Sequence, residues 1–144
     1  MKKTYKDGGV YEGESTLFTK KRHGKGKMTY KNGEIYEGEW KDDVRHGKGR
    51  LYRPKAFGEM YSYEGEWKDD QLNGKGKFTD GHITYEGDFV NDVREGEGTY
   101  VWKNGEYYIG EFKNNMMHGQ GVYFWPSGRT YEGEFYENKM VWDD

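Results

Sequence analysis

The chain of 144 residues is 32% hydrophobic and 34% charged, which alone is typical of disorder, but its aromatic content of 18% is too high for a solvated chain. It has no Cys, which excludes disulfide bonds and thiol chemistry, and it has no apolar run long enough to span a bilayer. The net charge of −3 hides an asymmetry, because residues 1–60 hold 15 Lys and Arg against 9 Asp and Glu, and residues 61–144 hold 8 against 17.

A tetrapeptide of the form Tyr-x-Gly-Glu/Asp divides the chain into units, since it recurs at steps of 25, 27, 22, 23 and 23 residues. Its copies begin at Tyr11, Tyr36, Tyr63, Tyr85, Tyr108 and Tyr131. A second signature, x-Gly-x-Gly, follows most copies. Periods of roughly 20–50 residues indicate a repeat array. Residues 1–144 are therefore predicted to form a single array, whose last unit is incomplete because Trp142 stands where the glycine pair should begin.

The first unit and the junction after the second unit depart from the regular spacing. The first unit has two extra residues in its loop, within residues 15–22, and the junction is longer by about four residues, at 53–60. Insertions in repeat arrays map to loops, so both segments are predicted to be surface excursions.

Basic residues are concentrated in the first unit. They are Lys20, Lys21, Arg22, Lys25 and Lys27. A basic surface attracts anionic headgroups, so one hypothesis is a membrane tether that binds phosphoinositides through this N-terminal half. The other interpretation is a solvated repeat surface whose composition drifts along the chain.

The second unit shows the predicted hairpin. Residues 35–41 alternate with a period of two, as in a strand, residues 42–46 are a polar turn, and residues 47–52 are the returning strand. A loop centred between residues 43 and 44 would pair Tyr36 with Leu51, Glu37 with Arg50, Gly38 with Gly49, Glu39 with Lys48, and Trp40 with Gly47. Each glycine would then leave a hole that a ring from the facing strand covers, which holds the register.

Short turns such as Asn104-Gly105 connect successive units. The sequence therefore predicts an all-β fold, in which tandem antiparallel β-hairpins form one elongated, twisted, single-layer sheet of about eleven or twelve strands.

The face opposite the Tyr and Trp side chains changes character along the chain. In the first three units it carries alternating Glu and Lys or Arg. In the later units it carries Val101, Tyr107, Ile109, Val122 and Phe124. A contiguous exposed apolar patch usually marks an interface, so these residues are predicted to bind a protein partner or a second copy. The alternative is a choice of β-forming residues at half-exposed sites. Trp142 is predicted to join this surface, at a C-terminal sheet edge that must be covered or paired.

Catalytic, metal and nucleic-acid sites are not supported. His23 and His46 occupy the same turn position as His118, and neighbouring units place them roughly 10 Å apart, too far to share a zinc ion. They are interpreted as turn residues that hydrogen-bond the backbone. The Gly-Lys-Gly elements lack the spacing and the helix of a phosphate loop. The acidic C-terminal half would repel phosphate, so no nucleic acid is expected. We predict no enzyme activity, cofactor or metal.

Tyr-x-Gly-Glu-Phe/Trp, a short polar turn and His-Gly-x-Gly resemble the MORN repeat (membrane occupation and recognition nexus), over about residues 5–142. The resemblance implies a single-layer, curved, all-β sheet whose concave face is lined by aromatic residues. The family's positions fall on Tyr36, Gly38, Trp40, Gly47 and Gly49. The fifth unit departs from the pattern, because Ile109 replaces the usual acidic residue.

MORN arrays occur in ciliary and cytoskeletal scaffolds, in membrane-junction proteins, and beside lipid kinases and a lysine methyltransferase domain. The expected function is a scaffold or adaptor that binds another protein through its groove or its C-terminal outer face. The alternatives are the phosphoinositide tether and a targeting module of a larger enzyme. The polar N-terminus without a signal peptide predicts a cytoplasmic protein. The resemblance suggests a cytoskeletal or ciliary location.

Overall fold

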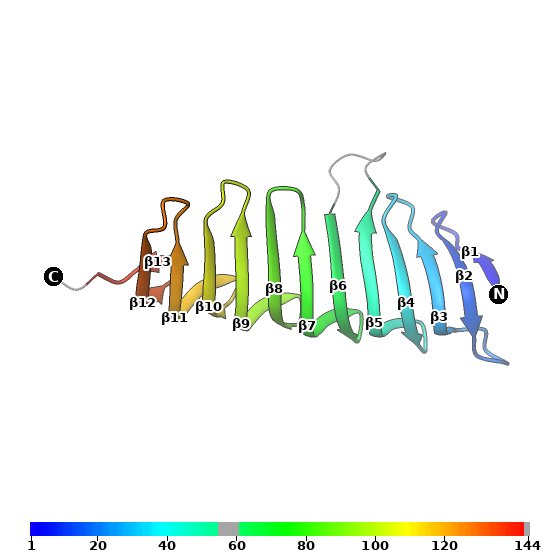
Figure 1. Cartoon of the computed structure of the whole chain (residues 1–144). Coiled ribbons are helices and arrows are strands. Elements are labelled where there is room, and N and C mark those ends of the chain that lie inside the picture. The colour runs from blue at the N-terminus through cyan, green and yellow to red at the C-terminus, as the bar shows by residue number, and fades with distance from the viewer. Residues whose placement is uncertain (55–60, 143–144) are drawn as a thin grey trace.

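The computed structural model describes residues 1–54 and 61–142, which form one antiparallel sheet of thirteen strands in chain order (Figure 1). The strands are β1 Lys2–Thr4, β2 Val10–Ser15, β3 Arg22–Thr29, β4 Ile35–Lys41, β5 Val44–Arg53, β6 Tyr61–Lys68, β7 Gln71–Thr79, β8 Ile83–Val90, β9 Val93–Trp102, β10 Tyr107–Lys113, β11 Met116–Phe124, β12 Thr130–Tyr136 and β13 Lys139–Met140. This part of the chain contains no helix, and hence no helix that could cross a bilayer.

The predicted fold class is confirmed, because each strand pairs only with its neighbours in sequence and the sheet is a single layer. The strand number exceeds the prediction because short strands close both ends. At one end β1 pairs with β2, and at the other β13 pairs with the last residues of β12.

In the hairpins after the first, two-residue turns join the strands along the lower edge of Figure 1. In the second unit they are Asp42 and Asp43, with φ of 47° and 70°. Left-handed values at both positions are typical of a type I′ turn, whose twist matches the strands and which favours Asn and Asp. The same conformation recurs at residues 69–70, 91–92, 114–115 and 137–138.

This turn is centred one residue earlier than predicted, and the pairing beside it changes accordingly. The confirmed pairs are Tyr36–Leu51, Glu37–Arg50 and Gly38–Gly49. The predicted pairing of Trp40 with Gly47 is wrong, since Trp40 lies opposite Arg45. The predicted Glu39–Lys48 cross-strand pair is likewise replaced by a bulge. The physical reason is that a type I′ turn uses only two residues, so the extra residues of β5 must bulge out.

The bulge explains the recurring acidic residue. Gly47 lies in the bulge with φ of 78°, and a Cβ there would collide with the Glu39 carboxylate. The Glu39 Oε2 atom accepts the backbone N–H of Lys48 at 2.5 Å. The equivalent contacts are Glu14 with Lys25, Glu66 with Lys75, Asp88 with Glu97, and Glu111 with Gln120. The carboxylate therefore fixes the backbone of the bulge.

The core consists of rings that lie over glycines. Tyr36 is fully buried, its hydroxyl donates to the backbone carbonyl of Glu39 at 2.8 Å, and a Cβ on Gly49 would overlap its ring. Trp40 and Trp67 pack edge-to-face on this ring at 4.9 and 5.4 Å between ring centroids. Because Trp67 belongs to the next unit, the same contacts that bury Tyr36 also join neighbouring repeats.

Hydrogen bonds also connect successive hairpin turns. The N–H of Asp43 donates to the carbonyl of Arg22, and the N–H of Arg22 donates to the Asp43 carboxylate at 2.8 Å. The Arg22 guanidinium donates to the Asp43 carbonyl at 2.9 Å and lies 4.5 Å from the centre of the Trp40 ring. Arg45 with Asp70 and Arg94 with Asn115 repeat the arrangement.

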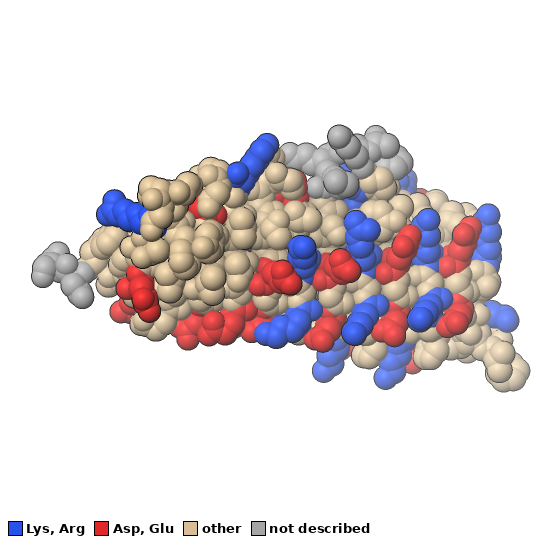
Figure 2. Space-filling model, in the orientation of Figure 1, with Lys and Arg blue, Asp and Glu red and all other residues tan. Residues whose placement is uncertain are grey.

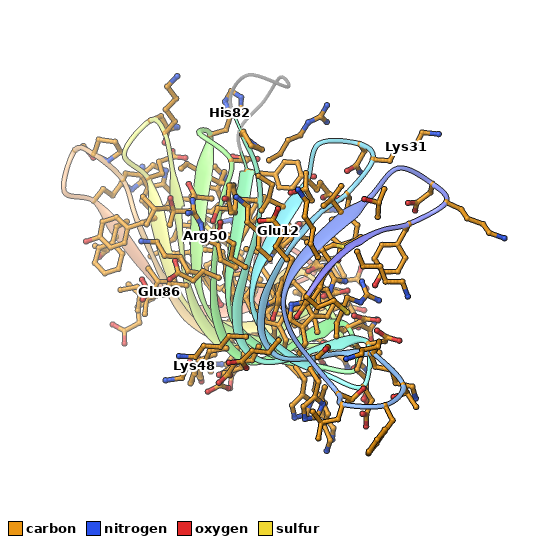
Figure 3. All side chains as sticks on the ribbon, turned by 90° about the vertical axis from the view of Figure 1, so that its right-hand side faces the viewer. Glu12, Lys31, Lys48, Arg50, His82 and Glu86 are labelled. Carbon is orange, nitrogen blue, oxygen red and sulfur yellow. The ribbon has the colours of Figure 1, made fainter. Side chains whose placement is uncertain are left out.

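The two faces of the sheet are distinct in the view along the array. Figure 3 shows the strands bending in their lower parts, with Lys48 and Glu86 on the outside of the bend. We call that side the outer face and the side of the buried Tyr and Trp rings the aromatic face. The longer loop of the first unit runs from residue 16 to 21 and projects from the hairpin-turn edge, as predicted. Of the predicted excursion at 53–60, residues 55–60 lie outside the described residues.

Candidate interaction surfaces

The outer face of β2 to β8 carries rows of opposite charges, seen as alternating red and blue in Figure 2. One row runs across the strands through Glu12, Lys27, Glu37, Arg50, Glu64, Lys77 and Glu86. Opposite charges directly across a strand pair contribute roughly 0.2–1 kcal/mol each. The charges in this half are therefore matched on the sheet itself.

The outer face of β9 to β11 is apolar instead, and the predicted residues do lie together there. Tyr107 lies opposite Val101 on one side and opposite Phe124 on the other, and Ile109 lies opposite Val122. The rings of Tyr107 and Phe124 are stacked, with 4.3 Å between centroids and 11° between planes. We call these five residues the C-terminal apolar patch. It corresponds to the largely tan region at the left end of Figure 2.

Trp142 is not part of this patch. Its ring packs on Tyr131 at 4.7 Å between centroids, and Tyr131 belongs to the same cross-sheet row as the buried Tyr108 on the aromatic face. The N–H of Val141 donates to the carbonyl of Glu134, and the Tyr131 hydroxyl donates to the carbonyl of Val141. The end of the described chain therefore covers part of the sheet edge.

The basic residues of the first unit are divided among three places. Lys20 and Lys21 are exposed in the 16–21 loop. Arg22 is held on the aromatic face beside Asp43, and its side chain is only 17% exposed. Lys25 and Lys27 lie on the outer face opposite Glu39 and Glu37. The structure thus does not bring the five predicted lipid-binding residues into one patch.

Two surface features were not predicted from the sequence. The tip of the 16–21 loop exposes Leu17 by 79% and Phe18 by 95%. Consecutive apolar residues inside an insertion were a signal that could have revealed it. The loop is stabilised at its base, where the hydroxyl of Thr16 accepts the N–H of Lys21 at 2.9 Å.

The second unpredicted feature is an aromatic cluster on the aromatic face of β9 and β11. Successive ring centroids lie 4.6 Å apart for Tyr100 and Trp102, 5.3 Å for Trp102 and Tyr123, and 4.9 Å for Tyr123 and Trp125. All four rings are only partly buried. The β9–β11 region therefore presents partly exposed apolar side chains on both faces of a single-layer sheet.

The histidines that the sequence placed at turns lie in strands, where two of them have a structural role. The Nδ1 atom of His23 accepts the backbone N–H of Asp42 at 3.3 Å, and that of His118 accepts the N–H of Glu137 at 3.2 Å. The expected hydrogen bond to the backbone is confirmed for these two, but the expected turn position is wrong, because His23 lies in β3 and His118 lies in β11. The described residues contain no group of three or more metal-ligating side chains.

A family model described as MORN repeat matches residues 20–35, 36–55, 63–81, 85–107, 108–128 and 131–141. These segments span most of the chain and follow the hairpins described above, so the chain belongs to the MORN-repeat family. MORN repeats suggest a repeat-based binding or scaffold module, and the family is generally non-enzymatic. No curated protein matches the chain.

Proposed function

We propose that this protein is a non-enzymatic scaffold that binds another protein through the C-terminal apolar patch. The observation that carries the proposal is the change on the outer face between β8 and β9. Ile109 is 46% exposed at the position that Glu37 and Glu64 hold in earlier units, and Val101 is 39% exposed. Burial contributes roughly 25 cal/mol per Å² of apolar surface, so a partner gains by covering this region.

The aromatic cluster on the opposite face supports the same location. A single-layer sheet that is apolar on both sides leaves two surfaces over β9–β11 that a partner chain can cover. A cytoskeletal or ciliary setting is supported by the family resemblance alone, and a cytoplasmic setting only by the polar N-terminus. Self-association at the C-terminal end is an alternative form of the same function, because β13 pairs only with the last residues of β12.

Capture from an extract of the source cells tests the proposal. The bait variants are the double variant Val101→Lys with Ile109→Lys and, as matched control, Glu64→Lys, which changes the net charge by the same amount on the same face. We expect wild type and control to retain the same proteins, and the double variant to lose them by about tenfold or more. Circular dichroism melts establish that all baits are folded.

Retention of the same proteins at equal strength by the double variant would overturn the proposal, as would equal loss in the control. Sedimentation velocity of the purified proteins identifies self-association. If wild type dimerises and the double variant stays monomeric, the occupant of the patch is a second copy.

An anionic membrane is a second candidate partner, favoured by the exposed tip of the 16–21 loop. Leu17 and Phe18 project there, and Lys20 and Lys21 follow after one intervening residue. Apolar side chains next to lysines fit a bilayer interface with anionic headgroups. The lipid-binding site proposed here is the compact tip of the 16–21 loop and not a broad basic face, since the Arg22 side chain is bound to Asp43.

Flotation with phosphatidylcholine vesicles, with and without phosphoinositide, tests this second candidate. We expect phosphoinositide-dependent binding that Phe18→Ser weakens by about tenfold, and that the outer-face control Lys27→Gln leaves unchanged. Absence of binding at low salt, or equal binding by the Phe18 variant, would contradict it.

A further inference from the structure

Unneutralised carboxylates border the C-terminal apolar patch. Glu97 and Glu111 lie directly opposite each other on β9 and β10, and Glu132 lies opposite Val122. Within residues 1–54 and 61–142, no ion pair involves a carboxylate beyond Asp88. Figure 2 shows an acidic row continuing below the tan region. Like charges directly across a strand pair are destabilising, so this arrangement costs folding energy.

The earlier units place cations where the later units do not. Lys25, Lys48 and Lys75 hold the position that Glu97 holds in the fourth unit. In the row above, Lys27, Arg50 and Lys77 give way to Thr99 and Val122. The later units therefore gain the apolar patch and also lose the basic residues that would neutralise its border.

We propose that the partner at this patch is a segment of another protein that presents apolar side chains together with Lys or Arg. Its apolar side chains cover Tyr107, Ile109 and Val122, and its basic groups meet Glu97 and Glu132. This inference rests on the proposed function and specifies the chemistry of the partner. A second copy fits less well, since two patches face to face bring their carboxylate borders into one interface. The lysines on its N-terminal outer face are already matched by glutamates.

The spacing on the sheet sets the spacing on the partner. Glu111 follows Ile109 by two residues on β10, and Glu97 precedes Val101 by four on β9. Two residues along a strand span about 7 Å, a distance that a Lys or Arg side chain bridges easily. The partner segment thus needs basic residues within about one or two side chains of its apolar ones.

Selection from a phage-displayed library of random dodecapeptides tests the inference. The library is panned on wild-type protein, after removal of phage that bind the folded Val101→Lys, Ile109→Lys variant. We expect enriched peptides to combine apolar residues with Lys or Arg and to be depleted in Asp and Glu. Their synthetic versions should bind more weakly as salt is raised, because the contacts are partly ionic.

The variant Glu97→Lys separates the contribution of charge to peptide binding from any effect on folding stability. It restores the residue type of the first three units opposite Glu111, so we expect an unchanged or slightly higher melting temperature. The same variant should weaken the enriched peptides by about tenfold, and Glu132→Gln should weaken them by a smaller factor. Glu64→Gln, at the position that Glu132 holds in the sixth unit, should not change their affinity.

The outcomes separate the inference from the function on which it rests. The inference would be overturned if the enriched peptides depend on the patch but are not enriched in Lys or Arg. It would also be overturned if Glu97→Lys does not change their affinity. In either case the patch would remain a binding surface. Peptides that bind the double variant equally, or failure to enrich any peptide, would also overturn the inference. The capture experiment then decides on the proposed function independently.

Discussion

The Glu39 carboxylate accepts the backbone N–H of Lys48 and lies beside Gly47, in the space that a side chain at that position would need. From the sequence, Glu39 was expected to lie opposite Lys48 across the hairpin. In the structure its carboxylate instead fixes the bulge around Gly47, whose φ of 78° lies in the left-handed region. The acidic residue and the glycine therefore recur together in the repeat because each requires the other.

Glu39→Ala is expected to lower the free energy of unfolding by about 1–2 kcal/mol, because a charge-assisted hydrogen bond to the backbone is lost. Glu39→Gln should lose less, since the amide oxygen can still accept the N–H. The control is Glu64→Ala, which removes a solvated outer-face charge opposite Arg50 and Lys77 and should cost under about 1 kcal/mol. Urea unfolding monitored by tryptophan fluorescence measures all three. Equal effects of Glu39→Ala and Glu64→Ala would show that the contact does not stabilise the bulge.

Gly49→Val should be strongly destabilising, because its Cβ would overlap the buried ring of Tyr36. Overpacking a core typically costs about 1–3 kcal/mol. Tyr36→Phe keeps the ring and removes only the hydroxyl that donates to the Glu39 carbonyl, so a loss of about 1 kcal/mol is expected. Thermal melts followed by circular dichroism show which of the two variants loses more stability. If Tyr36→Phe proves as damaging as Gly49→Val, the ring-over-glycine packing is not the main constraint.

Alkaline pH should unfold the sheet. Burial raises the pKa of the Tyr36, Tyr85 and Tyr108 hydroxyls well above the ordinary value of 10.0. Burial and the Glu34 carboxylate raise the pKa of Tyr61 to about 12. A raised pKa means that the folded chain keeps protons that the unfolded chain releases above pH 10. The stabilisation is thus complete below pH 10 and is lost as pH rises above it.

Each such tyrosine contributes about 1.4 kcal/mol per pH unit in that range, so Tyr36, Tyr85 and Tyr108 together give a slope of about 4 kcal/mol per unit. Urea midpoints measured at several pH values from about 9 to 12 should fall steeply only above about pH 10. Unchanged stability up to about pH 11.5 would show that these hydroxyls ionise freely in the folded protein.

The repeat pattern was sufficient to predict the all-β class, the hairpins and the outer-face rows. Alternation decides which side each residue faces, so Ile109 and Val122 were correctly placed on the same outer face. The turn was misplaced by one residue because the left-handed preference of Asp42 and Asp43 decides the loop length, and a polar run does not reveal it. The inward position of Arg22 could not be predicted, because it depends on Asp43 of the next unit. The solvent exposure of Phe18 likewise depends on loop geometry.

Site-specific photocrosslinking tests the central claim most directly. A benzoylphenylalanine is placed at position 109 or, as control, at position 64, which the repeat makes equivalent on the outer face. Each protein is irradiated in an extract of the source cells. We predict that position 109 crosslinks a discrete partner and that position 64 yields no crosslink. Adding an excess of wild-type protein without the crosslinking residue should abolish the crosslink at position 109. Equal crosslinking at both positions, or crosslinking only at position 64, would contradict the assignment of the C-terminal apolar patch as the binding surface.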